Sequence, residues 1–156
     1  MNYKFKRRIA LIAFLIYVLD SISKILALHF LANKDFRIIG NFLQLKLATN
    51  FGAAFSIGYS HGFLLALISF LVICVIFFFA RKLNNLKIGF PMGLMLGGAL
   101  GNLADRLFRA PYAGRGSIVD WIWIPHFSVF NLADIALSIG GIWLVLALLI
   151  SNSAKS

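Results

Sequence analysis

The sequence predicts an all-α integral membrane protein, built as a bundle of four transmembrane helices. Hydrophobic residues make up 61% of its 156 residues and the mean hydropathy is +0.90, well above the range of a water-soluble domain. A helix needs about 20 apolar residues to cross a bilayer. Four stretches reach that length, at residues 9–31, 62–80, 88–107 and 127–150. The chain, residues 1–156, is therefore expected to form a single membrane domain.

The first apolar stretch is expected to be retained as a transmembrane helix. A basic segment precedes it, as in a cleaved signal peptide. However, its apolar run is long for that role, it contains Asp20 and Lys24, and three further apolar stretches follow. Asp20 and Lys24 are four residues apart with the acid first, which favours an ion pair along the helix.

The two long connections, residues 32–61 and 108–126, are expected on the side of the membrane opposite the termini. Four spans place both termini together, with the short connection RKLNNLK on their side. The first long connection contains FLQLKLATN, whose alternation favours short strands over a helix. The second contains residues that interrupt regular structure, namely Pro111, Gly114, Gly116 and Pro125.

The basic residues favour an orientation with both termini in the cytoplasm. The net charge of +10 comes from residues scattered among the ends of the apolar stretches, without the basic stripe and interleaved aromatics of a nucleic-acid binder. Basic flanks of this kind follow the positive-inside rule. Eight basic residues lie on the side of the termini: Lys4, Lys6, Arg7, Arg8, Arg81, Lys82, Lys87 and Lys155. Six lie on the other side: Lys34, Arg37, Lys46, Arg106, Arg109 and Arg115.

The aspartates are the candidate functional residues. All five acidic residues of the chain are aspartates, and four of them lie in apolar surroundings: Asp20, Asp105, Asp120 and Asp134. A carboxylate at the centre of a membrane helix costs about 2.5 to 3.5 kcal/mol. Several such residues in one small chain indicate that the carboxylates serve a function.

Two of these aspartates have an asparagine on the same expected helical face. In GNLADR, Asn102 is three residues before Asp105 and four before Arg106. An ion pair between Asp105 and Arg106 that anchors the end of the helix would explain this group without catalysis. In FNLAD, Asn131 and Asp134 share a face about two turns into the last span. Burial of such groups indicates a shared proton or partner.

Asp120 follows the second long connection and is expected to meet Asp134 at one end of the bundle. Two adjacent carboxylates hold one proton between them and thus offer a general acid and a general base. Such a pair can activate water, as in aspartic proteases. The spacing also allows a structural polar network or a proton relay. The alternative function is therefore a small membrane transporter or proton channel that uses intramembrane aspartates.

No metal or organic cofactor is expected, because a carboxylate pair and water complete the chemistry. The three histidines are isolated, without the HExxH pair of a zinc site, and no glycine-rich phosphate loop is present. The single cysteine, Cys74, excludes a disulfide within the chain and a cysteine metal site.

Five short motifs together resemble those of the bacterial lipoprotein signal peptidases, also called signal peptidase II. In order along the chain they are DSISK, TNFGAAF, GGALGNLADR, IVD and FNLAD. The resemblance covers nearly the whole chain and implies a four-helix bundle with a small extracytoplasmic β-cradle and loop. It also implies an aspartyl endopeptidase of the bacterial cytoplasmic (inner) membrane. Such an enzyme removes the signal peptide of a prolipoprotein before its diacylglyceryl-modified cysteine.

The resemblance also assigns roles to residues of this sequence. It implies that Asp120 and Asp134 are the catalytic dyad. It implies that a further group lines the substrate site: Asp20, Lys24, Asn50, Gly52, Asn102, Arg106 and Asn131. Asp105 matches a supporting aspartate. Because the segment from Asp105 to Asp120 is longer than in many relatives and the next segment is shorter, Asp105 stays an alternative catalytic residue.

The expected partners follow from the same resemblance. They are a membrane-anchored diacylglyceryl prolipoprotein as substrate, and membrane lipid, with no nucleic acid. The active site is expected near the extracytoplasmic face. The chain is expected to act as a monomer.

Overall fold

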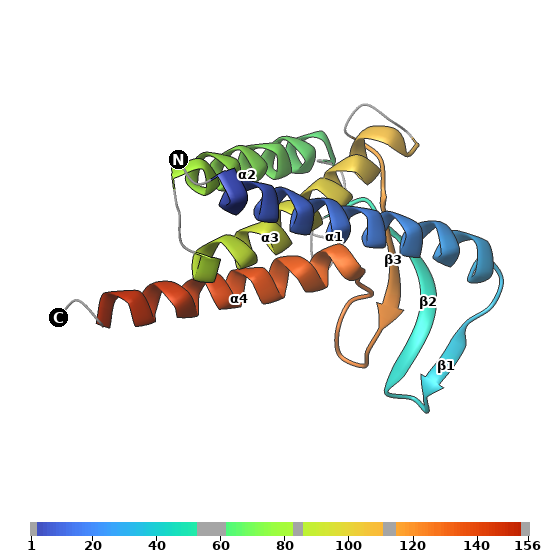
Figure 1. The fold of residues 1–156 in the computed structure, drawn as a ribbon. Helices are drawn as coiled ribbons and strands as arrows, with labels where there is room; N and C mark the ends of the chain where they lie inside the picture. Colours follow the sequence, from blue (N-terminus) through green and yellow to red (C-terminus); the bar gives the residue numbers. More distant parts are fainter. Residues whose placement is uncertain (1–2, 53–61, 83–85, 111–114, 154–156) are drawn as a thin grey trace.

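Four helices and a small sheet make up the fold. The computed structural model describes residues 3–52, 62–82, 86–110 and 115–153. The helices within these ranges are α1 (Tyr3–Phe30), α2 (Gly62–Lys82), α3 (Leu86–Phe108) and α4 (Leu132–Ser153). They form a bundle with the sheet at one end and both termini towards the other (Figure 1). The predicted helical bundle is thus present.

Helix α3 is the centre of the bundle and packs against each of the other three helices. Two of its glycines permit this close packing. A Cβ atom at Gly97 would lie 2.6 Å from the carbonyl oxygen of Ala13 in α1, and one at Gly98 would lie 2.5 Å from that of Ala133 in α4. Any larger side chain would push the helices apart, so the small residues of GGALG set the helix spacing.

Three of the four helices are long and apolar enough to cross a membrane within the described residues. They are α1, α2 over Gly62–Ala80 and α4 over Leu132–Ile150, and most of each such stretch faces outward from the bundle. Helix α3 is not among them, and its buried positions carry glycine and polar residues, among them Asn102, Asp105 and Arg106. The fourth span therefore stays a prediction.

The ends of two helices differ from the predicted spans. Helix α1 begins at Tyr3, before residue 9, so its basic residues lie within the helix. The predicted start of the last span at residue 127 is wrong, because α4 begins at Leu132. The residues before it are held by strand-like backbone bonds in which Phe130 N donates to Ile122 O and Ile122 N donates to Phe130 O.

A three-stranded antiparallel sheet closes one end of the bundle (Figure 1). Its strands are β1 (Phe36–Ile39), β2 (Leu43–Asn50) and β3 (Ile118–Trp123), in the order β1-β2-β3. The first two confirm the short strands predicted from alternation. No strand is predicted in the second connection from alternation, but IVDWIW forms β3 there because its β-branched and aromatic residues pair with β2. The glycine-rich run beyond Gly52 lies outside the described residues.

Candidate active site

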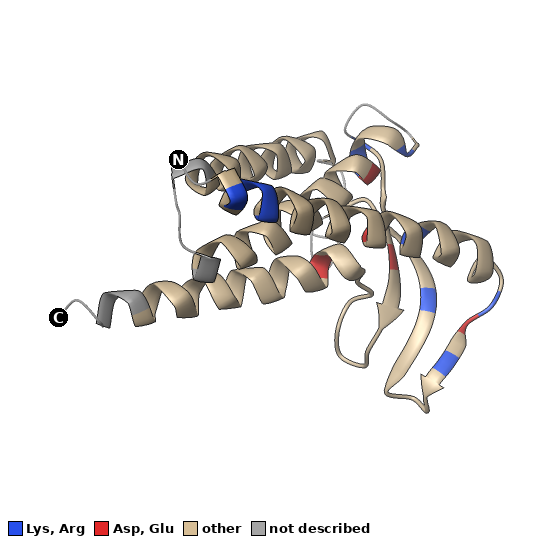
Figure 2. Cartoon of the chain, viewed as in Figure 1, with Lys and Arg blue, Asp and Glu red and all other residues tan. Residues whose placement is uncertain are grey.

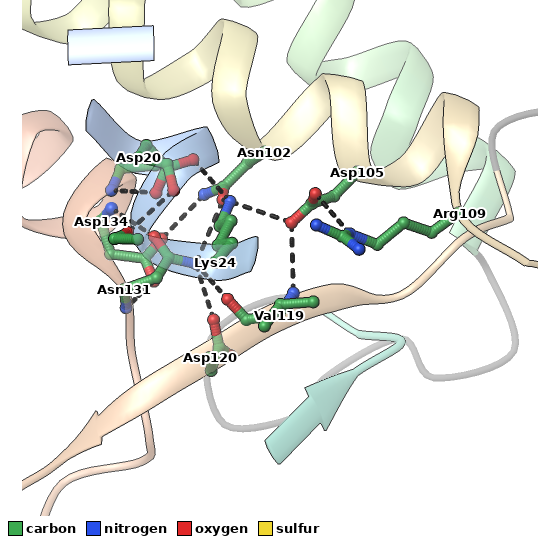
Figure 3. A network of polar contacts seen from close by, with 11 residues as sticks. Asp20, Lys24, Asn102, Asp105, Arg109, Val119, Asp120, Asn131 and Asp134 are labelled. Carbon is green, nitrogen blue, oxygen red and sulfur yellow. Dashed lines mark hydrogen bonds and ion pairs between the residues drawn. The ribbon is translucent and has the colours of Figure 1, made fainter. Parts of the chain in front are cut away.

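Polar side chains gather where the sheet meets the bundle. Figure 2 shows the aspartates of the helices and of β3 at this end of the molecule, away from the amino-terminal part of α1. Most of the predicted site residues are buried here: Asp20, Lys24, Asn102, Asp105, Arg106, Asp120 and Asn131. Except for Arg106, Figure 3 shows these residues in one connected network that also includes Asp134.

Lys24 is the cation at the centre of this network. Its side chain is 1% exposed, and Nζ lies 2.7 Å from Oδ2 of Asp20 and 2.9 Å from Oδ2 of Asp105. Nζ also donates a hydrogen bond of 3.0 Å to Oδ1 of Asn102. The predicted ion pair of Asp20 and Lys24 is confirmed. The same ammonium group additionally joins α1 to α3, which the spacing along one helix could not reveal.

Asp105 pairs with Lys24 and Arg109, and not with the adjacent Arg106. Arg109 Nε lies 2.6 Å from Oδ1 of Asp105. Neighbouring residues on a helix point in different directions, whereas Asp105 and Arg109 are four apart and share a face. The alternative interpretation, an ion pair between Asp105 and Arg106, is therefore wrong. Sequence reasoning also missed Arg109, although its spacing from Asp105 was the available signal.

Asp105 also fastens the strand that carries Asp120. Its Oδ2 accepts a hydrogen bond of 3.2 Å from the backbone N–H of Val119, the residue before Asp120 in β3 (Figure 3). Val119 is itself buried. Asp105 thus holds the backbone next to a predicted catalytic carboxylate. This contact is a physical basis for the supporting role expected of Asp105.

The amide of Asn102 has one possible orientation in this network. Its Oδ1 accepts from Lys24 Nζ and, at 3.2 Å, from Nδ2 of Asn131. An ammonium group can only donate, so the amide oxygen has to face Lys24. The amide nitrogen then faces α4 and donates a hydrogen bond of 2.8 Å to Oδ1 of Asp134. Lys24 therefore determines which group Asn102 presents to Asp134.

Asn131 and Asp134 form the amino-terminal cap of α4. Asn131 Oδ1 accepts from the backbone N–H of Asp134 at 3.0 Å, and Asp134 Oδ2 accepts from the backbone N–H of Asn131 at 3.2 Å. This reciprocal pattern is a capping box. The prediction that they lie two turns inside the last span is wrong, since they stand at its first turn. Asp20 adds to the cap, because its Oδ1 accepts from the backbone N–H of Ala133 at 3.0 Å.

Asn131 brings the two predicted catalytic aspartates together. Besides its cap with Asp134, its Nδ2 donates a hydrogen bond of 2.7 Å to Oδ1 of Asp120. Burial and the charge of Asp134 together raise the pKa of Asp120 to about 7, although hydrogen bonds from Asn50 and Asn131 oppose the shift. Asp120 thus titrates near neutral pH, within reach of a second carboxylate.

The remaining predicted residues lie at the end of β2. Asn50 Oδ1 accepts from the backbone N–H of Gly52 at 2.9 Å, which turns the chain after the strand. Arg106 Nη2 donates to the carbonyl oxygen of Gly52 and is 3% exposed. Among the described residues, no three His, Cys, Asp or Glu side chains are placed to hold a metal ion. The structure brings all the predicted site residues to one end of the bundle.

The sequence is similar to those of known lipoprotein signal peptidases. The model of the family described as signal peptidase (SPase) II matches residues 12–150. The lipoprotein signal peptidase of Streptomyces coelicolor is 45% identical over 145 residues, covering 90% of this chain and 71% of the relative. That of Streptomyces griseus subsp. griseus is 46% identical over 136 residues, covering 86% of this chain and 69% of the relative.

A solved structure agrees with these sequence matches. A bacterial membrane enzyme determined by the in meso method at 2.3 Å resolution superposes with a TM-score of 0.82 and 29% sequence identity, covering 96% of this chain and 92% of the other. Because the family model spans most of the sequence and the relatives match over most of their own length, the chain belongs to the signal peptidase II family, the lipoprotein signal peptidases.

Proposed function

We propose that this chain is an aspartic endopeptidase of the bacterial cytoplasmic membrane. It cleaves diacylglyceryl-modified prolipoproteins immediately before the lipidated cysteine. Family membership supports removal of lipoprotein signal peptides in general. The observation that carries the aspartic chemistry is the contact of Asn131 with both Asp120 and Asp134.

The two carboxylates differ in their surroundings, which supports different roles. Both oxygens of Asp134 accept hydrogen bonds, from Asn102 Nδ2 and from the backbone of Asn131. Asp120 is 2% exposed, and its pKa is raised to about 7 by burial and by Asp134. Asp134 therefore acts as the general base, and Asp120 holds the shared proton and acts as the general acid.

The reaction follows from these roles. Asp134 removes a proton from water as the water oxygen bonds to the scissile carbonyl carbon, and Asp120 gives its proton to the carbonyl oxygen. The tetrahedral diol collapses when one hydroxyl returns its proton to Asp120 and Asp134 passes its proton to the amine nitrogen. The C–N bond breaks, and the dyad returns to its starting protonation.

Arg106, Asn50 and Gly52 bind the substrate backbone beside the dyad. Arg106 uses Nη2 on the Gly52 carbonyl, while its buried Nε has no hydrogen-bond partner among the described residues. A buried donor without a partner is costly, and a substrate carbonyl would satisfy it. Asn50 contacts Asp120 and turns the chain towards Gly52.

The chemistry of this proposal lies near the extracytoplasmic surface. Helix α3 is the fourth span and is shielded from lipid by its neighbours, and both termini face the cytoplasm. A lipid-modified substrate is already anchored in the bilayer and enters laterally between helices. The proposed enzyme works as a monomer.

A cleavage assay tests the proposal. Purified wild type and Asp120→Asn are incubated with a prolipoprotein that carries the diacylglyceryl group and with the same protein lacking it. Wild type should cut the modified substrate alone, and Asp120→Asn should cut neither. Proton flux through reconstituted wild type without cleavage would favour the transporter alternative and refute the proposal.

A further inference from the structure

The end of the bundle opposite the active site carries basic residues without an acidic counterpart. The amino-terminal part of α1 contains Lys4, Lys6, Arg7 and Arg8, and Figure 2 shows this part of α1 far from every acidic residue of the described chain. No aspartate or glutamate occurs in residues 1–19, 36–104 or 135–156 of the sequence. The counter-ions of these cations therefore have to come from outside the protein's own side chains.

An apolar groove of about 440 Å³ lies beside these cations and is lined by residues of α1, α2 and α3. Its lining residues are Tyr3, Lys6, Arg7, Ile9, Ala10, Phe77, Ala80 and Leu96. Four of them, Tyr3, Lys6, Arg7 and Ala10, have the i, i+3, i+4, i+7 spacing of one helical face. The groove exists because α1 and α2 both pack on α3 but touch each other little.

The groove lining combines two chemistries. Its walls are hydrocarbon, from Ile9, Ala10, Phe77, Ala80 and Leu96, and the cations Lys6 and Arg7 in the first turns of α1 add positive charge. Long basic side chains at a helix end extend towards the membrane surface while their stems line apolar space. A ligand that fits has an apolar tail and a negatively charged head at the level of the first turns of α1.

We infer that this groove binds one anionic phospholipid, with an acyl chain between α1 and α2 and its phosphate on Lys6 and Arg7. Basic pockets between transmembrane helices on the cytoplasmic side bind such headgroups, and the groove volume lies within the range of about 300–1,000 Å³ for ligand sites. A signal peptide is the competing occupant. Its basic n-region would meet Lys6 and Arg7 and be repelled.

Native mass spectrometry of the full chain tests the inference, with phosphatidylglycerol and phosphatidylcholine in competition. Wild type should retain one phosphatidylglycerol in preference to phosphatidylcholine. Each basic residue near the surface contributes a factor of about 5 in affinity, so Lys6→Gln/Arg7→Gln should lose about 25-fold of this preference. Ala10→Trp should fill the groove and release lipid of both headgroups.

The matched control is Lys34→Gln/Arg37→Gln, which removes the same charge from exposed residues at the sheet end. It should keep the preference for phosphatidylglycerol, and all variants should keep cleavage activity as proof of folding. The inference would be overturned if the control lost the preference for phosphatidylglycerol to the same extent. It would also be overturned if Lys6→Gln/Arg7→Gln still retained one phosphatidylglycerol as wild type does. Displacement of the lipid by a lipidated signal peptide, or its expulsion when a second copy of the chain binds, would overturn it as well.

Discussion

Asn102 in α3 donates a hydrogen bond of 2.8 Å from Nδ2 to Oδ1 of Asp134 at the start of α4. The same amide accepts from Lys24, so the direction of this bond is fixed by the cation of α1. One side chain therefore links the structural ion pairs of the bundle to the proposed general base. The positions of the reacting groups thus depend on residues that do not themselves react.

Replacement of Asn102 by alanine should lower cleavage more than it lowers stability. The change removes a charge-assisted hydrogen bond of about 1.5–3 kcal/mol to the proposed base, which corresponds to about 10- to 100-fold in rate if it is lost in the transition state. The measurement is kcat/KM on lipidated prolipoprotein beside the amount of membrane-inserted protein. Loss of inserted protein together with activity would instead indicate a structural role.

Asp120→Asn and Asp134→Asn should each reduce cleavage by at least about 100-fold, because general acid–base catalysis contributes about that much or more. Both variants should still insert, since asparagine keeps the volume and part of the hydrogen bonding. Asp35→Asn is the matched control, because Asp35 is an exposed aspartate in the connection before β1. Near-normal turnover by either dyad variant would remove that residue from the mechanism.

Cleavage should fall as the pH rises above about 7. Asp120 has to carry a proton to act as the acid, and its pKa is raised to about 7 by burial and by Asp134. The stability of the fold depends on pH in the same direction. Between the ordinary pKa of an aspartate and about 7, Asp120 holds a proton in the native state that it has lost in the unfolded state, so stability falls with rising pH. The checks are a pH profile of kcat/KM and the midpoint of thermal unfolding.

Asp120→Asn provides the control for this pH dependence. An asparagine does not titrate, so the unfolding midpoint of the variant should change less than that of wild type between about pH 4 and 7. Parallel curves for the two proteins would show that another group is responsible.

Lys24→Met should destabilise the protein by about 3–5 kcal/mol, the cost of breaking a buried ion pair by removing one partner. Asp105 would keep Arg109, 2.6 Å away, but Asp20 would be left as an isolated buried charge. The double variant Lys24→Met/Asp20→Asn should therefore be more stable than Lys24→Met. Asparagine at this position can still accept from Ala133 N. Thermal unfolding of the three proteins measures this, and a double variant no more stable than the single one would contradict it.

Gly101→Ala should lower both stability and cleavage. A Cβ atom at Gly101 would overlap Oδ2 of Asp20, the oxygen that pairs with Lys24, and Asp20 is fully buried. Gly141→Ala in α4 is the control, because a Cβ there meets nothing within 4 Å. It should be neutral, or stabilising by up to about 1 kcal/mol through helix propensity. Equal effects of the two substitutions on the unfolding midpoint would exclude the proposed collision.

Local spacing was enough for several features of this protein. The apolar stretches located the helices, and the alternation in FLQLKLATN located β2. The ion pair of Asp20 and Lys24 followed from four-residue spacing with the acid first. These predictions succeed because the periodicity of a helix or a strand is a property of its backbone. It is the same wherever the element packs.

The position of Asp120 after the second connection allowed it to meet Asp134, but family resemblance assigned the two as a catalytic dyad and assembled the list of site residues. Periodicity alone left a polar network or a proton relay open, because it says nothing about which elements become neighbours. It also placed Asn131 and Asp134 inside a helix, since an apolar run does not show where the first turn begins. Their capping box forms because Phe130 is held against β3, outside the helix.

By itself, the sequence determined the apolar helices, the Asp20–Lys24 pair along α1 and, through its ordered motifs, the family. Only the tertiary structure decided that Lys24 serves both Asp20 and Asp105, that Asp105 holds Val119 beside Asp120, and that Asn131 contacts both proposed catalytic carboxylates. These contacts join segments far apart in the chain. Their distances depend on how closely α1, α3 and α4 pack. Glycines set that packing, and because glycine has no side chain it adds nothing to the apolar periodicity of a helix.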